Sequence, residues 1–424
     1  MSGPGTGRGW CRERRVVVTG LGPVTPVGVG REAFWEAICE GRSGTRRLAQ
    51  LPDGFPVASL QSRIVAPVTE DLGEGPLKEG PPDRRFSLGR QAMELALEDA
   101  GLEGLGETGA VVLGNAIGAS AAIESFFVRG GRRGRWVPAG SEGELLRQLS
   151  FHSLSHELAS RARCRGPVLT ISTGCTAGLD AVGTAAELVR WGAADRVLTG
   201  SSEAPLTPVV FTAFDRIGAL SRRNHDPGHA SRPFDRERDG FVLGEGAAML
   251  VLEERRQALA RQAHIYCEIA GFASLSNAFH MTRLPAGGSA LTECIQAALD
   301  DADVEPRQID HVNAHGSSTP QNDLCETNAI KGALGRHADR VTVNSLKALI
   351  GHALGASNAI ELAACALALD RQYLFPTSHL DQPGEGCDLD YVANRSRTAD
   401  LGWMLKLSNG FSGIHSAMVM RRAS

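Results

Sequence analysis

The stretch Pro167-Val-Leu-Thr-Ile-Ser-Thr-Gly-Cys-Thr-Ala-Gly-Leu-Asp180 is the best single guide to how this chain folds. It opens with an apolar, strand-like run that ends in small residues just before Cys175. A helical pattern begins at the cysteine itself, with apolar residues at positions 177, 179, 182, 185 and 188. A strand that passes through a tight turn into a helix is typical of α/β proteins, so the segment predicts that fold class.

A cysteine at such a turn is a candidate nucleophile. Unpaired backbone N–H groups and the positive end of the helix dipole favour the thiolate, so we expect a lowered pKa for Cys175. Gly174 and Gly178 should leave room for a thioester to approach the backbone. A buried structural thiol is the usual alternative for an isolated cysteine. Two distant histidine motifs decide in favour of catalysis.

These motifs are Val312-Asn-Ala-His-Gly-Ser-Ser-Thr-Pro320 and Asn344-Ser-Leu-Lys-Ala-Leu-Ile-Gly-His-Ala-Leu-Gly-Ala356. Each places one histidine, His315 or His352, beside a glycine, where the backbone bends sharply and a substrate can lie close. Together with the cysteine they supply a thiolate for covalent catalysis and two imidazoles that polarise a carbonyl or handle a carboxylate.

In this order the motifs resemble the β-ketoacyl synthases, the decarboxylating Claisen-condensing enzymes of fatty-acid and polyketide synthesis. The resemblance runs from about Arg15 to about Met420 and includes Val16-Val-Val-Thr-Gly-Leu-Gly22, Arg232-Pro-Phe-Asp-Arg-Glu-Arg-Asp-Gly-Phe-Val-Leu-Gly-Glu-Gly246 and Asn409-Gly-Phe-Ser-Gly413.

Within the family, the chain is most similar to the catalytic ketosynthase subunit of bacterial type II aromatic polyketide synthases. Asn277-Ala-Phe-His-Met-Thr282 and Cys387-Asp-Leu-Asp-Tyr391 are two of the segments that carry this likeness. Ser318-Thr-Pro320 and Asn344-Ser-Leu-Lys-Ala348 are closer to fatty-acid elongation synthases. A homodimeric fatty-acid elongation enzyme therefore remains the alternative.

The resemblance implies the thiolase fold, in which two similar α/β halves stack as five α-β-α-β-α layers with the site at their junction. We place a disordered arm at 1–14. The half that carries the nucleophile follows at 15–254, and the half that carries both histidines at 255–424.

The resemblance also implies the roles of the reacting groups. Cys175 would take an acyl group from a thioester. His315 and His352 would donate to the malonyl thioester oxygen as the enolate forms. The backbone N–H groups of Cys175 and Phe411 would form the oxyanion hole, and the Phe411 ring would act as a gate.

Four further residues would support the site. Lys347 would orient it from behind, paired with Glu326, and a purely structural ion pair is the alternative for those two residues. Ser317 and Thr319 would bind the phosphopantetheine arm of the carrier protein, and a turn filled by small polar residues is the alternative there.

The implied partners are an acyl carrier protein and a chain-length factor, a homologue that lacks the active cysteine. Retention of Cys175 argues that the chain is not itself such a non-catalytic subunit. No permanently bound cofactor or metal is implied, because the substrates arrive on phosphopantetheine. The basic run Arg129-Gly-Gly-Arg-Arg-Gly-Arg-Trp136 is either a solvated loop or a contact for the acidic carrier protein.

Composition limits the expected partners and the expected cellular compartment. A net charge of -4 gives no reason to propose a nucleic-acid partner. No apolar run approaches the ~18 residues that span a bilayer. The nine cysteines form no C-x-x-C pair, so reduced thiols in a cytoplasm are expected. Periodicity predicts a strand at Arg15–Thr19 and helices at Arg31–Cys39, Arg84–Ala100 and Ser289–Ala302.

Overall fold

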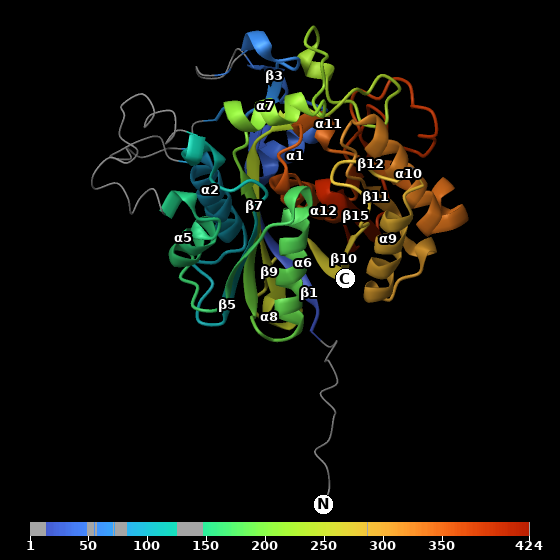
Figure 1. Cartoon of the computed structure of the whole chain (residues 1–424). Coiled ribbons are helices and arrows are strands. Elements are labelled where there is room, and N and C mark those ends of the chain that lie inside the picture. The colour runs from blue at the N-terminus through green and yellow to red at the C-terminus, as the bar shows by residue number, and fades with distance from the viewer. Residues whose placement is uncertain are drawn as a thin grey trace, which may run out of the picture.

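The computed structural model of the chain, shown in Figure 1, describes residues 14–48, 55, 57–70, 72, 83–124, 147–285 and 287–423. The arm expected at 1–14 lies outside these residues except for Arg14, whose guanidinium forms an ion pair with Asp195 at 2.5 Å. The basic run at 129–136 also lies outside them. Within the described ranges, no helix is both long and apolar enough to cross a bilayer.

One large sheet organises the molecule, and the short strand β2 (Gly28–Val29) is attached to it through β1. The other strands of the sheet follow in the order β12 (Thr342–Asn344), β11 (His311–Asn313), β15 (Trp403–Asn409), β16 (Ile414–Arg422), β10 (Cys267–Ser276), β1 (Val16–Thr25), β9 (Gly246–Glu254), β7 (Arg196–Glu203), β5 (Gly109–Gly114) and β6 (Val168–Ile171).

The sheet consists of two halves of the same design. The N-terminal half runs β1-β9-β7-β5-β6, and the C-terminal half runs β10-β16-β15-β11-β12. In each half the first two pairings are antiparallel and the next two are parallel. The halves join where β1 pairs with β10 at Val16, Val17 and Val18. The internal repeat is therefore one of topology, which direct comparison of the two half-sequences does not reveal.

Helices arrange the two half-sheets into layers (Figure 1). Between them lie α6 (Ala177–Arg190) and α12 (Gly355–Arg371), which contact strands of both halves. The outer faces are covered by α2 (Arg84–Asp99) and α5 (Ser153–Arg161) on one side and by α9 (Ser289–Ala302) and α10 (Pro320–Leu334) on the other. This is the five-layered thiolase arrangement that the resemblance implied.

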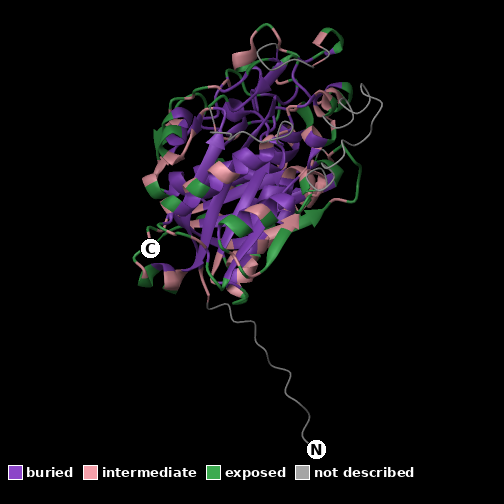
Figure 2. Cartoon of the chain, turned by 90° about the vertical axis from the view of Figure 1, so that its left-hand side faces the viewer, coloured by how far each residue is buried: buried purple, intermediate pink, exposed green. Residues whose placement is uncertain are grey.

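The two central helices are buried by close mutual packing. Every residue of α12 from Gly355 to Leu369 is buried, and Figure 2 shows the interior as one continuous buried region. A Cβ at Gly178 of α6 would lie 2.4 Å from the carbonyl oxygen of Gly355, so only glycine allows this approach. We expected Gly178 to make room for a thioester; the room is taken by α12 instead.

Most predicted elements are confirmed, with informative differences at their ends. The helices at Arg31–Cys39 and Ser289–Ala302 begin and end as predicted, as α1 and α9. Strand β1 extends to Thr25, beyond the predicted Thr19, because its second part pairs with β9. Cys175 lies in a 3-10 turn, η3 (Gly174–Thr176), so the regular helix begins at Ala177 and not at the cysteine.

Candidate active site

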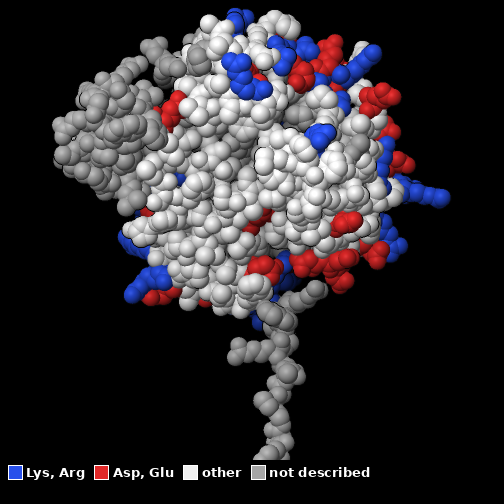
Figure 3. Space-filling view, viewed as in Figure 1, with Lys and Arg blue, Asp and Glu red and all other residues white. Residues whose placement is uncertain are grey.

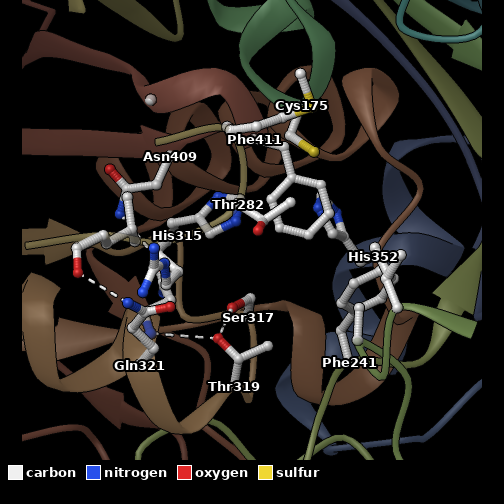
Figure 4. Close-up of a pocket in the computed structure, with 18 of the residues that line it drawn as sticks. Cys175, Phe241, Thr282, His315, Ser317, Thr319, Gln321, His352, Asn409 and Phe411 are labelled. Atoms are coloured by element: carbon white, nitrogen blue, oxygen red, sulfur yellow. Dashed lines mark hydrogen bonds between the residues drawn. The ribbon is translucent and has the colours of Figure 1, made fainter. Parts of the chain in front are cut away.

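A cavity of about 410 Å³ is lined by residues from both halves of the chain (Figure 4). The residues on its wall that were predicted from the sequence are Cys175, His315, Ser317, Thr319, His352 and Phe411. The sequence reasoning missed much of the remaining lining, which includes Phe214, Phe241, Asn409 and the segments 217–219, 280–284 and 320–322. The predicted residues Lys347 and Glu326 are fully buried and do not line the cavity.

Cys175 follows strand β6 and is held by a constrained turn. Gly174 adopts φ +67°, a left-handed conformation that glycine takes without strain, and has open space where a Cβ would stand. Asp180 of α6 accepts hydrogen bonds from the hydroxyls of Thr173 and Thr176, the latter at 2.7 Å. The amide of Asn358, on α12, donates to the carbonyl oxygen of Cys175. Both central helices therefore fix the position of the thiol.

The proton affinity of this thiol differs from the sequence expectation. Burial raises the pKa of Cys175 to about 11, and this outweighs the backbone N–H groups of Phe411 and Cys175 and the charge of Lys347, which lower it. The predicted lowering is therefore wrong, because the surroundings remove more hydration from the sulfur than these groups replace. Cys175 is therefore held as the thiol at neutral pH.

The loop that carries His315 follows β11 and is held from two sides. Glu326 of α10 accepts the backbone N–H of His315 at 2.6 Å and that of Gly316 at 2.8 Å. Lys347, at the start of α11 (Lys347–Ile350), donates to the carbonyl oxygen of His315 at 2.8 Å. The imidazole Nδ1 of His315 is buried and has no hydrogen-bond partner within the described part of the chain. His315 also lines the cavity, so a ligand there can contact its ring.

His352 follows α11 and lies next to His315, with ring centroids 5.2 Å apart and ring planes at 86°. Its Nδ1 is 2.9 Å from the hydroxyl of Ser357, which also accepts the backbone N–H of Ala353 at 2.8 Å. This hydroxyl has one proton to donate, so we assign that proton to the bond with Nδ1. The ring of His352 then carries its own N–H on Nε2.

The ion pair buried behind the histidines differs from the predicted one. Lys347 pairs with Glu361 of α12, Nζ to Oε1 at 2.6 Å, and not with Glu326. Lys406 of β15 lies 2.6 Å from the second oxygen of the same carboxylate, and all three side chains are fully buried. Glu326 instead serves backbone N–H groups, and burial raises its pKa to about 7. The predicted pairing of Lys347 with Glu326 is therefore wrong.

This cluster affects the protonation of both imidazoles. Burial, followed by the charge of Lys347, holds the pKa of His315 and of His352 well below the usual range; Lys406 contributes at both rings, and His352 contributes at His315. Both rings are therefore neutral at neutral pH, and each offers one N–H and one lone pair.

Ser317 and Thr319 lie across the cavity from Cys175 in Figure 4. Their hydroxyl oxygens are 3.0 Å apart. Thr319 also caps α10, because its hydroxyl accepts the backbone N–H of Asn322 at 3.3 Å. Part of its hydrogen-bonding capacity is therefore used by the fold, whereas Ser317 keeps more of its own.

The segment 410–413 brings Phe411 to the cavity wall. The centroid of its ring lies 6.2 Å from that of Phe214, and the residue is 36% exposed. Ser412 adopts φ +70°, a conformation that favours glycine, and donates its N–H to the carbonyl oxygen of Met281 at 2.5 Å. The backbone of this loop is thus tied to Met281, which also lines the cavity, while the Phe411 side chain remains partly exposed.

A hydrogen-bonded chain that the sequence reasoning missed braces the two ends of that loop. His415 donates from Nδ1 to Asn409 Oδ1 at 2.8 Å, and Asn409 donates to Asn322 Oδ1 at 2.9 Å. Burial lowers the pKa of His415 to about 4, so its ring is neutral.

The sequence analysis also missed Glu361 and Lys406. The signal that could have identified them was a charged residue inside an apolar helix or strand, which requires a buried partner.

Comparisons with known proteins identify the family. The family pattern described as "Beta-ketoacyl synthase, N-terminal domain" matches residues 13–258, and that described as "Beta-ketoacyl synthase, C-terminal domain" matches residues 266–381. A putative polyketide beta-ketoacyl synthase 1 of Streptomyces cyaneus is 45% identical and covers 96% of this chain and 98% of its own length. The tetracenomycin polyketide synthase ketoacyl synthase alpha subunit of Streptomyces glaucescens is 43% identical over 97% of both chains.

A 3-oxoacyl-[acyl-carrier-protein] synthase 2 of Coxiella burnetii is 38% identical over 97% of this chain and 99% of its own. Among solved structures, a type II PKS acyl-carrier protein in complex with its ketosynthase bound to the hexaketide matches with a TM-score of 0.90 and 41% identity, covering 97% of this chain and 100% of that one. The ishigamide ketosynthase/chain length factor matches with a TM-score of 0.88 and 30% identity, again covering 97% and 100%. Full-length relatives and a shared fold agree, and the chain belongs to the β-ketoacyl synthase family of acyltransferases.

Proposed function

We propose that the chain is the catalytic ketosynthase subunit of a type II polyketide synthase. It would condense an acyl chain held on Cys175 with malonyl carried by an acyl carrier protein. The observation that carries this proposal is that one thiol and two neutral imidazoles, those of His315 and His352, line a single cavity.

In the first step the enzyme is loaded. The sulfur of Cys175 attacks the carbonyl carbon of an acyl thioester, and the thiol proton leaves with the carrier thiol as the acyl-cysteine forms. The backbone N–H groups of Cys175 and Phe411 lie close enough to the sulfur to stabilise its thiolate. They are therefore suited to donate to the adjacent carbonyl oxygen as that oxygen gains negative charge.

In the second step malonyl on the carrier loses CO₂, and negative charge develops on its thioester oxygen. Ser357 directs the N–H of His352 to Nε2, and the ring of His315 lies close by. Two neutral donors suit an oxygen that becomes anionic only as the reaction proceeds, because they stabilise the enolate without transferring a proton to it.

In the third step the enolate carbon attacks the acyl-cysteine carbonyl. The sulfur of Cys175 leaves as thiolate and takes up one proton, while the β-ketoacyl product remains on the carrier. One carbon–carbon bond forms, CO₂ is released, and no external oxidant or reductant is consumed. Substrates tethered to phosphopantetheine are sufficient for this chemistry. The hydroxyls of Ser317 and Thr319, which line the cavity, would bind the amides of that arm.

A partner subunit fits the open edge of the N-terminal half-sheet. Strand β6 ends that half, and its residues Val168 and Leu169 are each 38% exposed. An exposed apolar edge strand is a template for pairing with another chain. The face in front of α6 also carries few charged side chains (Figure 3). We propose a cysteine-free homologue of the chain-length-factor kind at this edge.

The cysteines that the structure describes are free thiols, which fits a reducing cytoplasm.

The second candidate is a homodimeric fatty-acid elongation synthase, which performs the same condensation in a reductive pathway. The 38% identical relative from Coxiella burnetii favours it. The two candidates differ in what they need: the polyketide subunit requires its homologue for elongation, whereas the fatty-acid enzyme elongates as a homodimer.

The test is to incubate the purified chain with acyl- and malonyl-carrier protein, with and without the homologue, and to measure intact and peptide masses. We expect an acyl adduct on Cys175, then a β-ketoacyl product that depends on the homologue. Cys175→Ala should lose the adduct, and Cys164→Ala is the matched control that should retain it. Elongation of fatty acyl chains without the homologue would select the second candidate, and no adduct under any pairing would refute both.

A further inference from the structure

Lys406 is a charged residue inside an apolar strand. Its neighbours Leu405 and Leu407 in β15 are fully buried, and so is its own side chain. Its Nζ lies 2.6 Å from Glu361 Oε2 and donates to the carbonyl oxygens of Leu407, at 2.7 Å, and of Ala314, at 3.5 Å. A buried ammonium is costly unless its partners compensate for lost hydration, so this position needs an explanation.

Charge balance alone does not explain it, because the carboxylate of Glu361 already has a cation. Lys347 lies 2.6 Å from Oε1 of Glu361 and holds the carbonyl oxygen of His315 at 2.8 Å. Around Glu361, two ammonium groups and one carboxylate leave a surplus of one positive charge, which Glu326, with a pKa of about 7, offsets in part at pH 7. The two lysines contact successive backbone carbonyls, those of Ala314 and His315, immediately behind the cavity.

We propose that Lys406 is a positioning residue of the condensing site, which shares Glu361 with Lys347 to fix the backbone of His315 and supplies a surplus positive charge behind the cavity. The inference rests on the proposed function, because the condensation produces the negative charge that this cation would stabilise. Malonyl enters as a carboxylate, and its thioester oxygen becomes negative as CO₂ leaves. Two neutral histidines supply no net charge. A cation behind the His315 backbone stabilises the enolate oxygen held by the histidines more than the carboxylate that departs, without touching the substrate.

The histidine rings report on this charge. At His352, burial, then Lys347, then Lys406 hold the pKa down; at His315 the order is burial, Lys347, His352, Lys406 and His415. The titratable and charged groups around the rings are Cys175 of η3, Asp323 and Glu326 of α10, Arg238 beside Asp323, Lys347 of α11, Glu361 of α12, Lys406 of β15 and His415 of β16. Burial raises the pKa of Glu326 to about 7, so the cluster becomes more positive as the pH falls below 7.

Lys406→Met tests the proposal, because it removes the surplus charge and leaves the Lys347–Glu361 pair intact. We expect kcat for malonyl decarboxylation to fall about tenfold, with KM changed less than about twofold. NMR titration of ¹³C-labelled histidines should show the pKa of His315 and His352 about one unit higher, since a nearby cation has been removed. Lys331→Met removes a lysine from the surface ion pair with Asp388 and is the matched control, with both readouts unchanged.

A double variant, Lys406→Met/Glu361→Gln, separates charge from fold. It again holds one positive charge, on Lys347, so the histidine pKa values should return toward those of the wild type and part of the lost kcat should return. A fall in kcat without a change in the histidine pKa values would indicate a structural role only and would overturn the proposal. If Lys406→Met does not fold, Lys406→Gln keeps a donor for Glu361 and replaces it in the same assays. Failure of both to fold would assign Lys406 to the fold and also overturn the proposal.

The wild-type chain separates the two levels of inference. If it forms no β-ketoacyl product with its carrier protein and homologue, the proposed function fails, and the role of Lys406 fails with it. If the wild type is active and Lys406→Met matches it in kcat and in histidine pKa, only the role of Lys406 is refuted.

Discussion

Alkylation of Cys175 by iodoacetamide should follow a thiolate that is scarce at neutral pH. With the pKa raised by burial from 9.0 to about 11, about one thiol in 10⁴ is ionised at pH 7, against about one in 10² without the shift. A thiolate whose pKa is two units higher is also about tenfold more nucleophilic at a Brønsted slope of 0.4–0.5. The two effects leave Cys175 about tenfold slower than an unperturbed cysteine at pH 7, before restricted access to the cavity slows it further.

The assay is peptide mass spectrometry after timed treatment from pH 6 to pH 10, scored on the peptide that contains Cys175. Glutathione in the same reaction provides the unperturbed reference. The alkylation rate of Cys175 should rise about tenfold per pH unit through pH 10 without a plateau, whereas glutathione should level off near its own pKa. A plateau below pH 8 would refute the reasoning, because it would show that the turn lowers the pKa and that burial does not dominate.

Three further predictions address the surrounding hydrogen bonds. Ser357→Ala removes the hydroxyl that holds the N–H of His352 on Nε2, so kcat for decarboxylation should fall about tenfold. Acyl loading of Cys175, measured by intact mass, should stay within about twofold, and an equal loss of loading would contradict the tautomer role. Burial lowers the pKa of His415 to about 4 in the fold, so below pH 6.5 the unfolded chain takes up a proton that the folded chain does not. The free energy of unfolding therefore decreases as the pH falls, by about 2 kcal/mol at pH 5 relative to alkaline pH. His415→Gln should lose correspondingly less free energy of unfolding between pH 7 and pH 5 in urea titrations, and equal losses would disprove the shift. Ser412→Gly relieves the backbone strain of a residue at φ +70° and makes the loop more flexible. The free energy of unfolding should therefore change by less than about 1 kcal/mol, while acyl loading becomes faster. A larger loss of stability would show that the serine hydroxyl holds the loop.

Local pattern was sufficient to locate helices and strands. The helices α1 and α9 have the predicted ends because their apolar spacing stops at recognisable small or polar residues. Strand β1 was predicted too short, since its length depends on pairing with β9, which lies far away in the sequence. The role expected for Gly178 was wrong for the same kind of reason, because the close neighbour of its α-carbon is the carbonyl of Gly355 on another helix.

The candidate site shows the same difference between what local motifs reveal and what contacts between distant segments decide. Glycine-flanked histidines and a cysteine at a strand–helix turn were recognisable as chemistry-bearing motifs, and the structure places all three on one cavity. The ionic partner of Lys347 was not recognisable, because Glu361 and Lys406 reach it from a central helix and a distant strand. Several acidic residues were equally plausible partners from sequence alone.

Residue identity and order were enough to name the family and to propose which groups react, since both depend on motifs that are short and local. The protonation states of those groups depended on packing. The Cys175 thiol is held protonated, both imidazoles are neutral, and two lysines share one buried carboxylate behind the cavity. Each of these properties depends on how much water the fold removes and on which charges it brings close, and the segments responsible are separated in the chain and adjacent only once it has folded.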